Sequence, residues 1–140
     1  MKMFKPSFKI GQSVSNDQIM NEFVCKNSCG IRYSTTTNSI VLIANHNFGL
    51  YEDRPVGGTF LYTGEGQVGN QTMTRGNKRL NSAKFGYISV HLFEHFPGGI
   101  GYIYSGPVSV GEPYQETQPD INGKTRSVFI FPLTFIERGD

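Results

Sequence analysis

The sequence predicts one mostly β domain of the α+β class, a small twisted β-barrel with two or three short helices on its outside. Seven tyrosines, eleven phenylalanines and seventeen glycines in 140 residues favour strands and tight turns over a helical bundle. Short apolar runs alternate with turn signals along the chain, which is typical of a barrel. The length also fits one domain with a continuous core, residues 1–140.

Two segments carry the signals of helices. Residues Ser15–Gln18 have the form of a capping box, and the apolar residues after them recur at helical spacing. We therefore expect a helix from about Asn16 to Phe23. A second helix, which is short, basic and exposed, is expected between Gln71 and Ala83, with an interruption near Gly76.

Five segments are predicted as strands. The run Ile40–Ala44 is apolar throughout, which indicates a strand that is buried on both faces. Glycines end a second strand, Thr59–Thr63. Pro132 places the last strand, or its end, at a sheet edge, and Gly111–Lys124 is expected to be a polar loop. The three remaining strands are Tyr87–His95, Gly101–Val110 and Arg126–Phe135.

Charge and composition exclude few functions. The net charge of +2 and the pI of about 8.6 are compatible with a nucleic-acid partner without requiring one. No apolar run approaches the ~20 residues of a membrane-spanning helix, and the N-terminus lacks the apolar core of a signal peptide, so we expect a cytoplasmic protein. Cys25 and Cys29 are predicted to be free thiols, and neither a metal nor another cofactor is expected.

The segment His91–His95 fits the H-x-x-E-H pattern of one class of zinc peptidase. That pattern requires a helix, where residues four apart lie about 5 to 6 Å from each other. Here apolar residues alternate as in a strand, in which four residues span about 13 Å, so the two histidines could not share an ion. No catalytic residue is therefore assigned. An enzyme remains an alternative, a small nuclease or hydrolase that uses His46, His91, His95 and Glu94.

The segment Leu50–Gly66 combines two tyrosines, an aspartate and a pair of adjacent glycines in a short, turn-rich stretch. A buried strand would not carry charged residues such as Glu52 and Asp53 in its middle, and a flexible linker would not contain so many aromatic residues. The segment is therefore a candidate for holding a ligand.

Several runs of residues, taken in order, resemble the SRA domain, which reads modified cytosine as a flipped base. Those runs are Leu50–Asp53, Phe60–Gly66, Gly69–Gln71 and Asn77–Ser82. Later runs are similar to the branch of the family found in bacterial restriction endonucleases that cut only modified DNA, usually with an HNH nuclease domain farther along the chain. They are Val90–Phe93, Tyr102–Gly106, Glu112–Glu116, Gln118–Asp120 and Arg126–Leu133, and the similarity extends from about Phe8 to Phe135.

The resemblance implies a PUA-like barrel whose concave face grips DNA while one nucleotide rotates into a pocket. Extruding a base costs a few kcal/mol, and stacking on an aromatic ring returns about 1 to 3 kcal/mol. The resemblance implies that Tyr51 and Tyr62 hold the base between their rings. Asp53 would accept a hydrogen bond from the exocyclic amine of cytosine, a donor that thymine lacks. Thr63 and backbone amides near Gly64 would serve the remaining base acceptors.

Three features depart from the family's pattern. Leu50 competes with Tyr51 for its place, because the loop is one residue shorter here. Asn70 stands where the family usually has aspartate. Eukaryotic members also insert a finger before that position, for which there is no room in this chain. The tetrapeptide Gly76–Arg79 looks like the tip of that finger but lies on the predicted second helix, where we expect it to contact phosphates.

Basic residues are predicted to contact the DNA backbone, where they would fix the register and add salt-dependent affinity. Each of them is equally compatible with an ordinary solvated charge. The candidates are Arg54, Arg75, Lys78, Arg79, Lys84 and Arg126.

The predicted function is a specificity module that binds 5-methyl- or 5-hydroxymethylcytosine in double-stranded DNA and performs no catalysis itself. A nuclease domain in a longer chain would cut the DNA, and homodimer formation stays open. From the residues alone, the favoured interpretation places Tyr51 and Tyr62 in the core or its rim and makes Asp53–Pro55 a turn with a surface ion pair. The resemblance reverses this preference in favour of a base pocket. An RNA or small-ligand reader on the same PUA-like barrel is a further alternative.

Overall fold

The computed structural model describes residues 3–46 and 50–136. Its elements in chain order are β1 (Ser13–Val14), α1 (Asn16–Phe23), β2 (Ile31–Ser34), β3 (Ser39–Asn45), β4 (Arg54–Val56), β5 (Thr59–Thr63), α2 (Arg75–Ser82), the 3₁₀ helix η1 (Ala83–Phe85), β6 (Ser89–His95), β7 (Tyr102–Val110), β8 (Tyr114–Pro119) and β9 (Thr125–Phe135). Neither α-helix is long and apolar enough to cross a bilayer in the described part of the chain.

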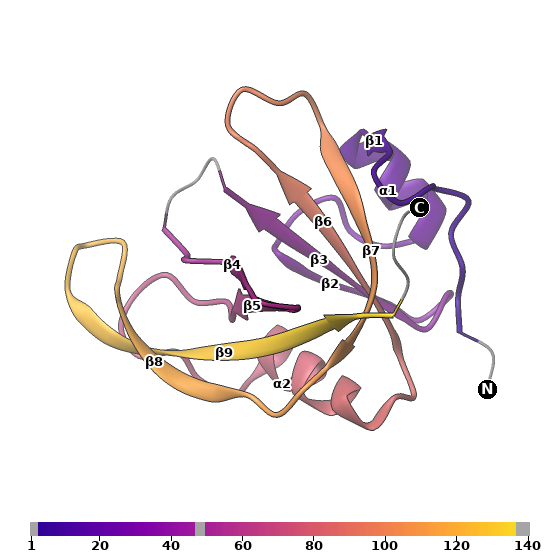
Figure 1. Cartoon of the computed structure of the whole chain (residues 1–140). Coiled ribbons are helices and arrows are strands. Elements are labelled where there is room, and N and C mark those ends of the chain that lie inside the picture. The colour runs from indigo at the N-terminus through magenta and orange to yellow at the C-terminus, as the bar shows by residue number, and fades with distance from the viewer. Residues whose placement is uncertain (1–2, 47–49, 137–140) are drawn as a thin grey trace.

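The described strands form one sheet in the order β2-β3-β6-β7-β9-β5-β4, with β1 beside β7 and β8 beside β9. Strands β3 and β6 run parallel, and the other neighbours are antiparallel. Figure 1 shows the sheet strongly twisted and curved, with α1 near β1 at one end and α2 at the other. The prediction of a mostly β fold with short flanking helices is confirmed.

Strand β3 explains how the sheet builds two cores. Side chains alternate between the faces of a strand. Ile40, Leu42 and Ala44 accordingly belong to the core inside the curved sheet, which Phe60, Leu92 and Phe131 also enter. Val41 and Ile43 point to the other face, where Ile19 and Phe23 of α1 cover them. The apolar run was thus correctly predicted to be buried on both faces.

The first helix has the predicted bounds, and its capping box is present. The Gln18 backbone N–H donates to Ser15 Oγ (3.0 Å), and the Ser15 N–H donates to Gln18 Oε1 (2.7 Å). The second helix begins at Arg75, later than expected, and Gly76 belongs to its first turn instead of interrupting it. The residues before it are drawn into a loop, because the Gln71 side chain bonds the backbone at Gly64.

The segment Gly111–Lys124 is not only a loop, as expected, because it contains β8. Its residues pair with β9 from Tyr114 opposite Ile130 to Pro119 opposite Thr125. Most of the β8 side chains are polar and exposed, so the sequence carries no apolar alternation there. Pairing with β9 makes this segment a strand.

Strand β9 lies inside the sheet, so the predicted edge position of Pro132 is wrong. One side of β9 pairs with β5, and the other side pairs first with β8, up to Ile130, and then with β7, from Leu133. Pro132 lies where this neighbour changes, and its carbonyl accepts a hydrogen bond from the Gly111 N–H (2.8 Å) on that side. The missing N–H of proline therefore faces the gap between two neighbours, where it removes no ladder hydrogen bond.

Candidate functional site

A cavity of about 750 Å³ lies between β2, β3 and the end of β5, and it extends to the loop after β5, the start of α2 and Tyr102 of β7. This volume is in the range of small-ligand sites in proteins. Four of the five predicted base-pocket residues line it, namely Tyr51, Tyr62, Thr63 and Gly64. Leu50, which competed with Tyr51 in the sequence, is not among the lining residues. Polar side chains on the wall include Arg32, Asn45, Glu65, Gln71 and Asn77.

Tyr62 forms a fixed part of the cavity wall. Its side chain comes from β5, is 3% exposed and joins the inner core. The hydroxyl proton is shared between the carbonyls of Gly30 (3.0 Å) and Ile43 (3.2 Å). Burial raises the pKa of this hydroxyl well above its ordinary value of 10.0, so the ring is a neutral phenol. Its position is therefore set by the fold.

Tyr51, which also lines the cavity, is less buried than Tyr62. Partial burial raises the pKa of its hydroxyl, and a hydrogen bond with the backbone of Gly66 opposes that shift. Tyr51 precedes β4, and its hydroxyl reaches across to the loop that follows β5. Of the three described tyrosines that line the cavity, Tyr62 is thus anchored in the core and Tyr51 lies near the loop after β5, while Tyr102 comes from β7.

Asp53 lies behind the cavity wall and reaches it through Thr63. Its Oδ1 accepts a hydrogen bond from the Thr63 backbone N–H (2.7 Å), and it is not itself a lining residue. Burial raises the pKa of Asp53 from 3.8 to about 6, against the opposing effects of the Thr63 hydrogen bonds and of the nearby His46 and Arg54. A carboxylate has about four lone-pair sites, so Asp53 keeps acceptor capacity beyond the bonds to Thr63.

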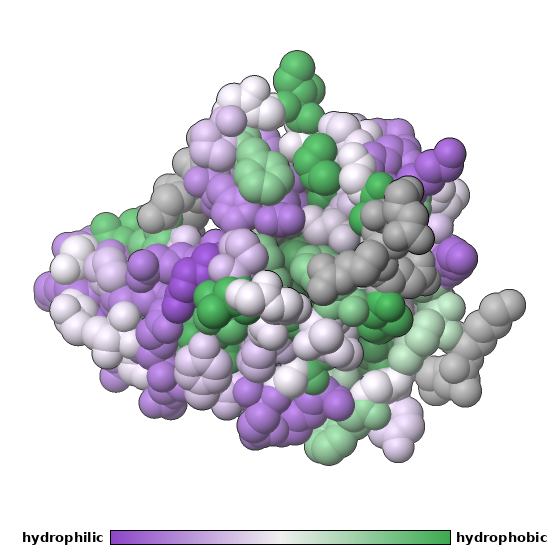
Figure 2. Space-filling view, viewed as in Figure 1, coloured by the Kyte–Doolittle hydropathy of each residue, from purple (hydrophilic) through white to green (hydrophobic). Residues whose placement is uncertain are grey.

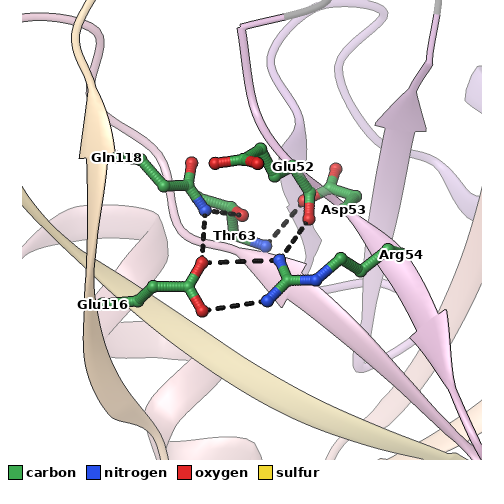
Figure 3. A network of polar contacts seen from close by, with 6 residues as sticks. All are labelled: Glu52, Asp53, Arg54, Thr63, Glu116 and Gln118. Carbon is green, nitrogen blue, oxygen red and sulfur yellow. Dashed lines mark hydrogen bonds and ion pairs between the residues drawn. The ribbon is translucent and has the colours of Figure 1, made fainter.

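A polar network from β8 supports Thr63 on its other side (Figure 3). Gln118 Nε2 donates to Thr63 Oγ1 (3.3 Å) and to Glu116 Oε2 (3.0 Å). The Glu116 carboxylate in turn accepts hydrogen bonds from NH2 (2.9 Å) and NH1 (3.4 Å) of Arg54. The hydrogen bonds from Arg54 and Gln118 lower the pKa of Glu116. Because Gln118 donates into the Thr63 hydroxyl, the proton of that hydroxyl is free to point at Asp53.

The loop after β5 is shaped by side chains that sequence reasoning did not single out as site residues. Gln71 Nε2 donates to the Gly64 carbonyl (2.6 Å), and Gln71 Oε1 accepts from the Phe129 N–H (2.9 Å). Asn70, at the position where the resemblance led us to expect aspartate, accepts from the Ser127 N–H (2.9 Å). The triplet Gly69–Gln71 was visible in the sequence, but its role as a brace depends on β9.

Gly64 is required by the packing of this loop. A Cβ atom there would lie 2.7 Å from Asn77 Oδ1 and 2.9 Å from Gln71 Oε1. Asn77 uses that oxygen to accept from the Glu65 N–H (2.8 Å). By contrast, a Cβ at Gly57 or Gly58 would meet nothing within 4 Å, and neither glycine lines the cavity.

This geometry agrees with a comparison of the whole chain with known proteins. The ScoMcrA-like SRA domain matches residues 10–138. The chain belongs to this family. No curated protein matches the sequence.

Solved structures share the fold of this SRA domain at low sequence identity. The sulfur-binding and SRA domains of ScoMcrA, complexed with phosphorothioated DNA, align with 94% of the chain at 16% identity and a TM-score of 0.76. The SUVH5 SRA domain aligns with all of it, in complexes with hemimethylated CG DNA (19%, TM-score 0.74) and with fully hydroxymethylated CG DNA (20%, TM-score 0.72). The chain covers 97% of each SUVH5 chain, but 40% of that ScoMcrA chain and 28% of the ScoMcrA endonuclease.

The basic candidates of the SRA domain fall into two groups. Arg75 and Lys78 are exposed on α2, and their side chains make no hydrogen bond or ion pair with the described residues. The others are engaged within the protein. Arg79 stacks on Tyr33 (4.2 Å), Lys84 pairs with Glu112 (2.9 Å) and Arg54 pairs with Glu116 (2.9 Å).

Arg126 has a different position from the surface one that we expected. It is 4% exposed, and its NH1 donates to the carbonyls of Gly66 (2.6 Å) and Gly69 (3.0 Å). The guanidinium therefore braces the loop after β5 from inside.

The histidines of the SRA domain do not converge on one point. His46 pairs with Glu94 (2.9 Å), His91 Nδ1 bonds the Tyr104 hydroxyl (2.8 Å), and His95 Nδ1 donates to the Gly101 carbonyl (2.7 Å). Burial lowers the pKa of His91 to about 4, so this ring is neutral at pH 7. Within residues 3–46 and 50–136, no three His, Cys, Asp or Glu side chains form a group that could hold a metal ion.

Proposed function

We propose that this SRA domain recognises 5-methyl- or 5-hydroxymethylcytosine in duplex DNA by rotating the base into the cavity between Tyr51 and Tyr62. The observation that carries the proposal is that Tyr51, Tyr62 and Thr63 line one cavity, with Asp53 hydrogen-bonded to the Thr63 backbone behind that wall. The SRA neighbours of known structure are complexed with modified DNA, which supports the same class of ligand here.

In this proposal each residue has one task. Tyr62 is a fixed stacking surface, because its hydroxyl is anchored and its ring is part of the core. Tyr51 closes over the other face of the base. Asp53 accepts a hydrogen bond from the exocyclic amine, which selects cytosine over thymine. Stacking at about 1 to 3 kcal/mol per ring offsets the few kcal/mol that extrusion costs.

The domain binds and does not cut. The histidines that would serve a nuclease are separated and engaged, one of them as a buried neutral ring. Cleavage would then belong to a nuclease domain linked to this one.

Titration of oligonucleotide duplexes that differ only at the 5-position of one cytosine tests the proposal. The domain should bind the methylated or hydroxymethylated duplex more tightly than the unmodified one. In a matched duplex that carries thymine at the same position, Asp53→Ala should abolish the preference for 5-methylcytosine over thymine. Glu52→Ala is the matched control, since Glu52 is an exposed neighbouring carboxylate. Tighter binding to RNA than to any duplex, or equal binding to all duplexes, would refute the proposal.

A further inference from the structure

The connection between β6 and β7 presents an isolated apolar side chain to solvent. Ile100 is 93% exposed, more than any other large apolar residue in the described part of the chain, and Phe96 at the start of the same connection is 44% exposed. Figure 2 shows apolar atoms projecting at this hairpin tip, at the top of the view. The segment Phe96–Gly101 contains no charged residue, so none of its side chains can form an ion pair with phosphates.

The hairpin tip is held rigidly at its outer turn. Gly99 N–H donates to the Phe96 carbonyl (3.0 Å), which closes a four-residue turn over Pro97 and Gly98. Gly98 has a φ of +77°, and proline followed by a glycine with positive φ is the pattern of a type II turn.

Two further bonds fix the backbone immediately after the Ile100 side chain. Ser13 Oγ donates to the Ile100 carbonyl (3.0 Å), and His95 Nδ1 donates to the Gly101 carbonyl (2.7 Å). Gly101 has a φ of +77°, and a Cβ there would lie 2.6 Å from the Val14 carbonyl oxygen. The exposed side chain therefore projects from an ordered backbone, and its exposure does not come from a loose loop.

The hairpin tip adjoins the cavity at its C-terminal end, and its N-terminal end contacts a residue that follows the cavity wall in sequence. Tyr102, two residues after Ile100, lines the cavity, so the two Cα atoms are at most about 7 Å apart. At the other end, Phe96 stacks on His46 with ring centroids 4.9 Å apart, and His46 follows Asn45, another lining residue. The apolar tip is thus next to the place into which a base would rotate.

We propose that this tip is the wedge that enters the DNA helix and fills the position left by the extruded base, with Ile100 as the inserting side chain. The inference rests on the proposed function and adds to it the surface that stabilises the emptied stack. Proteins that open or kink a duplex insert apolar side chains such as Ile and Phe between base steps. Rigid presentation lowers the ordering cost of such an insertion.

The test compares Ile100→Ala with wild type on two duplexes that each contain one 5-methylcytosine. In the first duplex the modified base is paired with guanine, and in the second it is an unpaired single-nucleotide bulge. Ile121→Ala is the matched control, because Ile121 is 50% exposed near the tip of the β8–β9 hairpin. Thermal unfolding of each variant verifies that the substitutions leave the fold intact.

Ile100→Ala should weaken binding to the paired duplex at least about tenfold, equivalent to about 1.4 kcal/mol. It should leave binding to the bulged duplex within about twofold, because a bulge leaves no gap in the stack. Unchanged binding to the paired duplex, equal losses on both duplexes, or the same loss for Ile121→Ala would overturn the wedge. Failure of the wild-type domain to prefer 5-methylcytosine over cytosine in either duplex would instead overturn the proposed function.

Discussion

Replacement of Asp53 by asparagine changes one acceptor oxygen into a donor amide and keeps the size of the side chain. The Thr63 backbone N–H, 2.7 Å from Oδ1 in the wild type, is a fixed donor. The asparagine must therefore turn its carbonyl oxygen toward Thr63, which points its NH₂ group at the base. The exocyclic amine of cytosine would then face a second donor, whereas thymine would offer an acceptor.

The size of the effect follows from the bond that is lost. A hydrogen bond to a charged group contributes about 1.5 to 3 kcal/mol, and the unpaired donor adds to the loss. The ratio of affinities for 5-methylcytosine and thymine should therefore fall by about 30- to 150-fold on Asp53→Asn, taking about 2 to 3 kcal/mol in total. Each protein's ratio of affinities for 5-methylcytosine and thymine is divided by the wild-type ratio. The free-energy cost of extruding each base from its duplex is the same for both proteins and therefore cancels.

The same substitution should stabilise the free domain. The pKa of Asp53 is raised from 3.8 to about 6, so the folded state holds a proton more tightly than the unfolded state, and ionisation opposes folding above pH 6. This difference corresponds to at most about 3 kcal/mol at pH 8, reduced by the charge-assisted bonds that asparagine loses. Burial of the Asp53 carboxylate thus lowers the stability of the free domain at the proposed base pocket.

Two measurements at pH 8 test these effects. Fluorescence anisotropy gives the affinities for duplexes with 5-methylcytosine or thymine opposite guanine, and urea unfolding gives the stability of the free proteins. A wild-type affinity ratio in Asp53→Asn would show that the carboxylate does not contact the base, however the family behaves. A loss of stability at pH 8 would show that burial of this carboxylate is not costly.

Three further outcomes are expected. As pH falls from 7 to 5, Asp53 gains its proton near pH 6, so binding to modified DNA should weaken while the free domain becomes more stable. Both pH dependences should be flatter in Asp53→Asn, and equal slopes in the two proteins, measured by anisotropy and urea unfolding, would contradict this. Gly64→Ala should lower the free energy of unfolding in urea titrations by about 1 to 3 kcal/mol, because its Cβ would collide with Asn77 and Gln71. Gly58→Ala is the control and should be nearly neutral, because a Cβ there meets no atom within 4 Å. Lys78→Ala should weaken binding to all duplexes alike and reduce the salt slope by about 1, and an effect restricted to modified DNA would exclude a phosphate contact.

Signals that depend on neighbours in the chain were readable from the sequence. The capping box of α1 and the two-faced burial of β3 follow from residue order alone, and the structure has both. Strand β8 could not be predicted, because the polar segment Tyr114–Pro119 becomes extended only by pairing with β9. The edge position predicted from Pro132 was wrong for a related reason. A proline is tolerated inside the sheet here only because β7 ends and β8 begins beside it, which the sequence does not show.

The candidate site shows the same limit. The tyrosines and Asp53 could be selected by their spacing and by the family resemblance, and the structure brings Tyr51 and Tyr62 to one cavity. The contact between Asp53 and Thr63 requires the short hairpin of β4 and β5, and β4 has no apolar pattern of its own. The buried position of Arg126 could not be foreseen, because an arginine that braces carbonyls from inside has no distinguishing mark in the sequence.

Strand β9 has a consequence for how the chain is made. It is the last described strand, and it joins β5, β7 and β8, of which β5 precedes it by more than 60 positions. During synthesis the edges of the earlier strands stay unpaired until β9 leaves the ribosome, and unpaired edges can pair with other chains. A nascent chain that stalls before residue 125 is therefore expected to depend on chaperones, even though all the described residues that line the cavity have already been translated.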